Sequence, residues 1–126
     1  MEQYSKIVES VNVKFGDARR LTINKSLRVE GLYEIDNTIY FVHRGKLLFK
    51  SEDLEGEVHE GQMLLIPSSL VCTITYLKDA NDDVDTIDSM KNQEFIEKKS
   101  SYIAPKEDED ELYLTEVLFK TKVFDS

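Results

Sequence analysis

The chain of 126 residues is 40% hydrophobic and carries a formal net charge of −9. This length suits one domain, predicted to span 1–126, which can bury a core without disulfides or metals. The negative charge argues against direct binding of nucleic acid, because contact with phosphates needs clustered lysine and arginine side chains.

Cys72 is the single cysteine, so no disulfide can form within the chain. One thiol without a disulfide framework suits a reducing compartment. Residues 1–10 contain no apolar core, so we do not expect a secretory signal. No run approaches the roughly 20 apolar residues of a membrane span. We therefore expect a cytoplasmic protein that does not enter a membrane.

Alternating apolar and polar residues, which indicate half-buried strands, dominate the first part of the chain. Residues 27–36 show the pattern, with one apolar face made of Leu27, Val29, Tyr33 and Ile35. The same pattern, or a short apolar run between turn formers, predicts further strands at 6–15, 38–44, 46–50, 62–67 and 70–77.

The composition changes in the last third of the chain. Residues 85–99 contain good helix formers and no glycine or proline, and we predict one short helix there. Asp85 would cap its N-terminus, and Lys98 and Lys99 would lie in the last turn, where cations are favourable. Residues 113–124 alternate again and predict a long final strand. The sequence therefore predicts an all-β domain, a sandwich or barrel of about eight short strands.

Two glycines, Gly45 and Gly61, each border an apolar run. The first run is IYFVHRGKL (39–47) and the second is GQMLLIPSSLVC (61–72). Each glycine permits a sharp turn between strands, and Pro67 ends the second run because proline cannot donate to a ladder. Together these segments resemble the cupin barrel, in particular the N-terminal ligand-binding barrel of AraC-type transcriptional regulators.

The resemblance implies an all-β, cupin-like jelly-roll barrel or sandwich that senses a small molecule and dimerises within an AraC-type regulator. The implied effector is a sugar or small organic acid, and the implied assembly is a homodimer. A similar glycine-bounded strand pair occurs in the cyclic-nucleotide-binding jelly roll, which holds its phosphate with a Gly-Glu-Leu turn and an arginine. This chain has LIPSSLVCTIT at that place and no arginine after Arg44, which disfavours that alternative.

The resemblance also indicates where a metal would bind. Metal cupins use two histidines and a glutamate from the first motif and one histidine from the second. Residues 31–42 contain no histidine, and the second-motif histidine aligns with Cys72. A zinc or iron site needs three or four convergent ligands, whereas the sequence offers only Cys72, His43 and His59. We therefore predict no metal and no cofactor.

Barrels hold small ligands with aromatic walls and a few polar groups. The predicted ligand-binding residues come from strands that would line or flank the barrel: Tyr33, Tyr40, Phe41, His43, Phe49, Cys72 and Tyr76. The alternative for the aromatic residues is a filled core, and for His43 a packed or rim position. The alternative for Cys72 is a small buried hydrophobic residue and not a reactive thiol.

Three functions follow from these observations. The first is the metal-free sensing and dimerisation module that the resemblance implies, with no direct nucleic-acid binding by this chain. The second is a stand-alone binding or scaffold protein whose edge strands pair in a homodimer. The third is a small cupin enzyme, an isomerase or a dioxygenase. The missing metal ligands argue against this third function, so we do not expect an enzyme.

Overall fold

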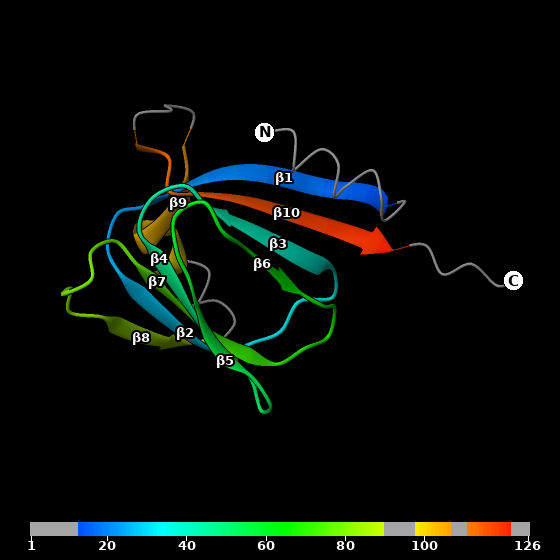
Figure 1. Cartoon of the computed structure of the whole chain (residues 1–126), viewed down its shortest axis with the longest axis horizontal. Coiled ribbons are helices and arrows are strands. Elements are labelled where there is room, and N and C mark those ends of the chain that lie inside the picture. The colour runs from blue at the N-terminus through cyan, green and yellow to red at the C-terminus, as the bar shows by residue number, and fades with distance from the viewer. Residues whose placement is uncertain (1–12, 90–97, 107–110, 122–126) are drawn as a thin grey trace, which may run out of the picture.

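The computed structural model describes residues 13–89, 98–106 and 111–121, with side chains described from Asp17 onward and up to Lys120. Its strands form two five-stranded sheets that face each other (Figure 1). A short helical turn covers 98–102. The strands are β1 (Val13–Ile23), β2 (Leu27–Leu32), β3 (Asn37–Val42), β4 (Lys46–Lys50), β5 (Glu55–Val58), β6 (Met63–Ile66), β7 (Cys72–Leu77), β8 (Asp85–Asp88), β9 (Ile103–Pro105) and β10 (Leu114–Thr121).

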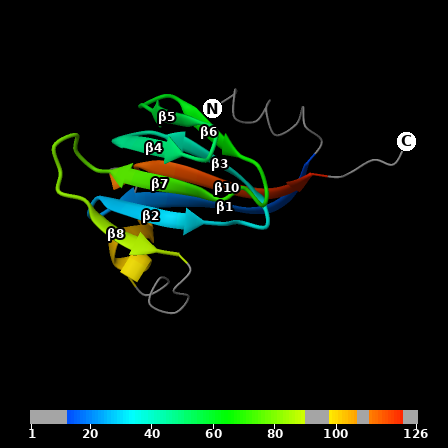
Figure 2. The same ribbon diagram turned by 90° about the horizontal axis from the view of Figure 1, so that it is seen from below.

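Sheet A has the strand order β6-β3-β10-β1-β9, and sheet B has the order β5-β4-β7-β2-β8. Neighbouring strands are antiparallel, except for β2 and β8, which are parallel. Figure 2 shows the strands of sheet B in front of those of sheet A. Each described sheet keeps two edge strands, so the molecule is an open sandwich and not a closed barrel. The all-β prediction is confirmed.

The main core lies between the two sheets and takes side chains from both. Leu47 and Ile74 of sheet B and Leu114 of sheet A are fully buried there. A smaller cluster of buried residues lies on the other face of sheet A and contains Ile39, Val117 and Phe119. Strands β3 and β10 of sheet A therefore carry buried apolar side chains on both faces, because alternate residues of one strand point to opposite faces.

The predicted helix at 85–99 is wrong at its start. Asp85–Asp88 form β8, which pairs with β2 so that Asp85 lies opposite Leu27. Ile87 packs against the main core. Residues 90–97 lie outside the described residues. Pairing with β2 provides hydrogen bonds to backbone groups that would otherwise bond within a helix. A local sequence pattern does not reveal this partner, because β2 lies far from β8 in the sequence.

Both terminal strand predictions are partly described. The strand predicted at 6–15 overlaps β1, which begins at Val13 and continues to Ile23, and its earlier part lies outside the described residues. The strand predicted at 113–124 overlaps β10, and its end lies outside them too. Strand β9 was not predicted, because its three residues are too few to show a period.

Candidate functional site

Four of the seven predicted ligand-binding residues lie between the sheets. Tyr40, Phe49, Cys72 and Tyr76 belong to the main core cluster, and none is more than 8% exposed. Tyr40 comes from sheet A and the other three come from sheet B. Their close packing agrees with the alternative of a filled interior, and their contact with a ligand stays a prediction.

Tyr33 does not lie in the interior, which corrects that part of the prediction. Its side chain is 52% exposed. Gly31 has a positive φ of 67°, and the pairing of β2 with β7 shifts register between Val29 and Leu32. Leu32 therefore lies opposite Cys72 and is buried. A register shift of this kind moves the following side chains to the opposite face.

Phe41 and His43 also lie outside the inter-sheet core. Tyr40 and Val42 of β3 belong to that core, so the residue between them points to the other face of sheet A. Phe41 packs there against the smaller cluster. His43 follows β3, and its Nε2 lies 2.7 Å from Thr115 Oγ1. The prediction that Phe41 and His43 line the same interior as Tyr40 was wrong, because neighbouring residues of a strand point to opposite faces of the sheet.

Tyr40 and Tyr76 connect the two sheets through their hydroxyl groups, which lie 2.8 Å apart. Their rings meet edge to face, with centroids 6.0 Å apart and an interplanar angle of 82°. Glu116 lies opposite Tyr40 on one side and opposite Arg19 on the other. Arg19 Nε donates to Glu116 Oε1 over 3.2 Å. The guanidinium thus compensates a carboxylate that is only 4% exposed.

The phenols of this cluster are hydrogen-bonding groups and not bases. Burial raises the pKa of Tyr40 well above its ordinary value, and the neighbouring Tyr76 and Glu116 raise it further. Burial also raises the pKa of Tyr76, whereas the Lys99 ammonium lowers it. Lys99 Nζ lies 5.9 Å from the centroid of the Tyr76 ring. Both phenols therefore keep their protons at neutral pH.

Sequence reasoning missed Arg19, Glu116 and Lys99 in this cluster. The available signal was Glu116 itself, the one charged residue within the mostly apolar stretch LTEVLF (114–119). A charge at that place in a strand requires a buried partner. Arg19 carries no local signal, because it meets Glu116 across two strands from opposite parts of the chain.

The two histidines lie in different surroundings. His43 contacts Thr115 beside sheet A, whereas His59 Nε2 lies 3.2 Å from Glu57 Oε2 on an exposed turn. Across 13–89, 98–106 and 111–121, no group of three or more His, Cys, Asp or Glu residues is placed to hold a metal ion.

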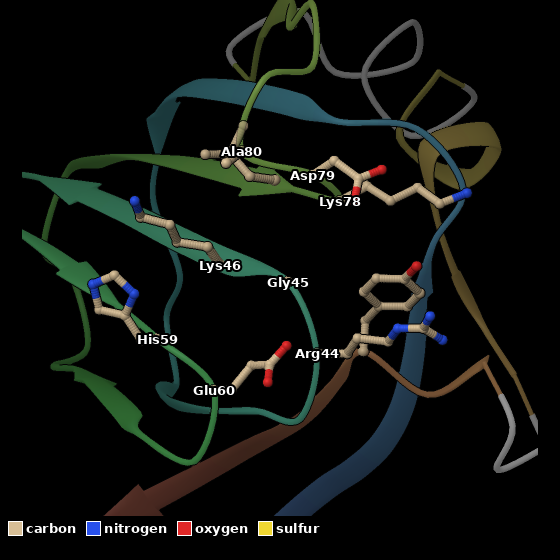
Figure 3. A pocket seen from close by; sticks show the side chains of 10 residues that line it. Arg44, Gly45, Lys46, His59, Glu60, Lys78, Asp79 and Ala80 are labelled. Carbon is tan, nitrogen blue, oxygen red and sulfur yellow. The ribbon is translucent and has the colours of Figure 1, made fainter.

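A pocket of about 690 Å³ opens at the end of the sandwich where β3 turns into β4 (Figure 3). We call it the sheet-end pocket. Its walls come from the β3–β4 turn, the β5–β6 turn and the segment that follows β7. Its volume lies in the range of about 300 to 1,000 Å³ that small-molecule sites occupy. Its charged and polar lining consists of Arg44, Lys46, His59, Glu60, Lys78 and Asp79.

Gly45 sets the shape of this pocket. Its φ is +79°, and a Cβ atom there would lie 2.5 Å from the carbonyl oxygen of Leu77 and 3.2 Å from the ring of Tyr113. On the neighbouring turn, the N–H of Gly61, whose φ is +81°, donates to the Val42 carbonyl over 2.8 Å. The two motif glycines therefore hold two of the turns that form the pocket.

The charges of the pocket are only partly neutralised. Lys46 Nζ lies 3.2 Å from Glu57 Oε2, which His59 also contacts. Arg44 lies over the ring of Tyr113, with its guanidinium carbon 5.4 Å from the centroid. The remaining charged residues of the lining take part in no ion pair within the described ranges. They are Arg44, Glu60, Lys78 and Asp79.

Comparison with known proteins identifies no relative of this chain. A scan against protein-family models, a search of curated proteins and a search of solved structures each found no match. In the described part of the chain, no helix combines the length and apolar character that crossing a membrane requires.

Proposed function

We propose that this chain is a metal-free, cupin-like jelly-roll module that binds a small polar molecule in the sheet-end pocket. As part of a cytoplasmic AraC-type transcriptional regulator, it senses the molecule, while contact with DNA belongs to another part of that regulator. A stand-alone binding protein that uses the same pocket is the alternative.

The pairing of the strands supports the jelly-roll part of the proposal. Apart from the edge strands β8 and β9, β1 pairs with β10, β2 with β7, β3 with β6, and β4 with β5. Each strand thus pairs with its counterpart counted from the other end of the chain. This pairing is expected when a long antiparallel ribbon rolls into two sheets, as in the jelly rolls that include cupins.

The observation that carries the binding function is the sheet-end pocket itself. It has the volume of a small-molecule site, and its lining supplies hydrogen-bond donors and acceptors from three separate connections. The turns that hold Gly45 and Gly61 form two of its walls. Two walls of the pocket therefore belong to the turns that contain the glycines on which the resemblance to the sensing barrels rests.

Dimerisation is supported by the outer face of sheet A. On the edge strand β6, Met63 is 38% exposed and Leu65 is 52% exposed. They lie opposite Phe41 and Ile39, so the four side chains share one face, on which Ile39 is buried and Met63 and Leu65 are exposed. An apolar patch at a sheet edge favours pairing with a second copy of the chain. We expect gel filtration to give the mass of two chains, and the Leu65→Lys variant to give the mass of one.

A thermal-shift screen of sugars, organic acids and amino acids, followed by calorimetry, tests the binding function. Ala80 lines the pocket and is exposed, so Ala80→Trp is expected to fill the pocket and abolish binding while the fold is retained. The matched control is Leu54→Trp, at a 68% exposed position outside the pocket lining. The proposal fails if no compound binds, or if Ala80→Trp binds as well as the unaltered chain.

A further inference from the structure

The sheet-end pocket brings together two cations and two anions that are not neutralised by partners. Arg44 comes from the β3–β4 turn, Glu60 from the β5–β6 turn, and Lys78 and Asp79 from the segment after β7. None of the four takes part in an ion pair within the described residues.

The charged groups lie on different sides of the pocket. In Figure 3, Arg44 and Lys78 extend on the same side of the pocket, whereas Lys46 and His59 lie on the opposite side, with Glu60 between them. Lys46 and His59 already contact a carboxylate outside the lining. The positive charge available to a ligand is therefore that of Arg44 and Lys78.

Arg44 is held in place before any ligand arrives. Its guanidinium lies over the ring of Tyr113, 5.4 Å from the centroid, and the face of an aromatic ring attracts a cation. The backbone N–H of Arg44 also donates to the Tyr113 carbonyl over 3.1 Å. A side chain that is already positioned loses less conformational freedom on binding, so Arg44 is suited to bind a carboxylate.

We propose that the sheet-end pocket binds a small zwitterion with one carboxylate and one ammonium group, either a free amino acid or a short peptide. The inference rests on the proposed function, because it names the ligand class of the same pocket. The ligand carboxylate accepts charge-assisted hydrogen bonds from Arg44 and Lys78, and the ligand ammonium donates to Glu60 and Asp79.

Charge balance favours a zwitterion over the other polar ligands of this size. A simple anion would satisfy Arg44 and Lys78 but would bring its charge close to Glu60 and Asp79, and like charges at close range repel. An amine would meet the opposite difficulty. A neutral sugar would form hydrogen bonds with all four residues, but it would bring no opposite charge to any of them and would gain no Coulomb attraction between unit charges.

The experiment is calorimetry on the full chain with the twenty protein amino acids and dialanine as probes. The tightest-binding probe is then compared with two analogues, the α-hydroxy acid that lacks the ammonium and the amine that lacks the carboxylate. We expect each analogue to bind weaker by about tenfold or more. Arg44→Gln and Glu60→Gln should weaken zwitterion binding similarly, whereas the matched variants Lys50→Gln and Glu52→Gln, outside this pocket lining, should not.

Each result has a defined meaning. Zwitterion binding that needs both charged groups and both variant positions supports the inference, and the comparison of amino acid with dialanine identifies the source of the zwitterion. A hydroxy acid or an amine that binds as tightly as the zwitterion overturns the inference. If sugars or organic acids bind and no zwitterion does, the inference is wrong while the proposed function stands. If no compound of any class binds, both fail.

Discussion

The hydroxyl groups of Tyr40 and Tyr76 lie 2.8 Å apart and form a hydrogen bond between the two sheets of the sandwich. Both residues are buried, at 2% and 0% exposure. Neither hydroxyl can exchange its partner for bulk water. The Tyr76 hydroxyl bonds that of Tyr40, whereas the Tyr40 hydroxyl also bonds the side chain of Glu116.

A double-mutant cycle on this pair should show strong coupling. We expect Tyr40→Phe to lower the free energy of unfolding by about 1 to 3 kcal/mol, because it leaves the buried Tyr76 hydroxyl without its partner. Tyr76→Phe should cost less, because the Tyr40 hydroxyl keeps its hydrogen bond to Glu116. The double variant should cost less than the sum, since no hydroxyl without a partner remains. Urea denaturation of the four proteins measures this. Additivity to within about 0.5 kcal/mol would contradict the expected coupling.

Alanine substitutions at Gly45, Gly61 and Gly56 should change the free energy of unfolding by different amounts, with the largest loss at Gly45. Gly45→Ala should lower the free energy of unfolding by more than about 2 kcal/mol, because left-handed backbone costs about 1 to 2 kcal/mol and the new Cβ also meets the Leu77 carbonyl. Gly61→Ala should cost only the backbone term, since no atom lies within 4 Å of its Cβ position.

Gly56 serves as the control for these substitutions. It lies in β5, has no positive φ and has open space at its Cβ position. Gly56→Ala should therefore be neutral, or stabilising by about 0.5 to 1 kcal/mol. Thermal denaturation compares the three variants, and equal losses at the first two positions would show that the close approach to Leu77 has no energetic effect.

Cys72 should react slowly in the folded protein. Its side chain is 4% exposed, and burial raises the pKa of the thiol to about 11. Near pH 8 only about one molecule in a thousand would carry the reactive thiolate. We expect slow labelling by a disulfide reagent in buffer and rapid stoichiometric labelling in denaturant, with Cys72→Ser unlabelled in both. Fast labelling of the native chain would contradict the burial of this thiol.

Acid should destabilise the protein in part through His43. Burial, and next the charge of Arg20, lower the pKa of His43 below its ordinary value of 6.5. Protonation is therefore less favourable in the folded chain than in the unfolded chain. His43 therefore contributes its full stabilisation at pH values above the pKa that it has in the unfolded chain. This contribution is lost as the pH falls below that value and through the lower pKa that His43 has in the folded chain.

His43→Gln removes this titration while keeping a group that can bond Thr115. We expect the variant to lose less unfolding free energy than the unaltered chain between about pH 7.5 and pH 5. The titration of the His43 ring followed by NMR should also have its midpoint below 6.5. A midpoint above that value, or equal pH profiles for the two proteins, would show that His43 is not the group responsible.

The amino-acid sequence by itself determined the strands whose side chains alternate. Residues 38–44, 46–50 and 70–77 were predicted as strands and overlap β3, β4 and β7, because burial of one face imposes a period of two on the residues themselves. The turn at Gly45 was also readable, since a glycine between two apolar runs indicates a sharp turn. These features depend on neighbours within a few positions along the chain.

The tertiary structure decided which of these side chains meet. Tyr33 is exposed because a register shift in β2 reverses its face, and the start of the predicted helix is a strand because β2 offers it an edge. Arg44, Glu60 and Lys78 line one pocket only because the sheets bring three distant turns to the same end of the sandwich. Such contacts follow from the pairing of strands far apart in sequence, which leaves no periodic signal in the segments that it joins.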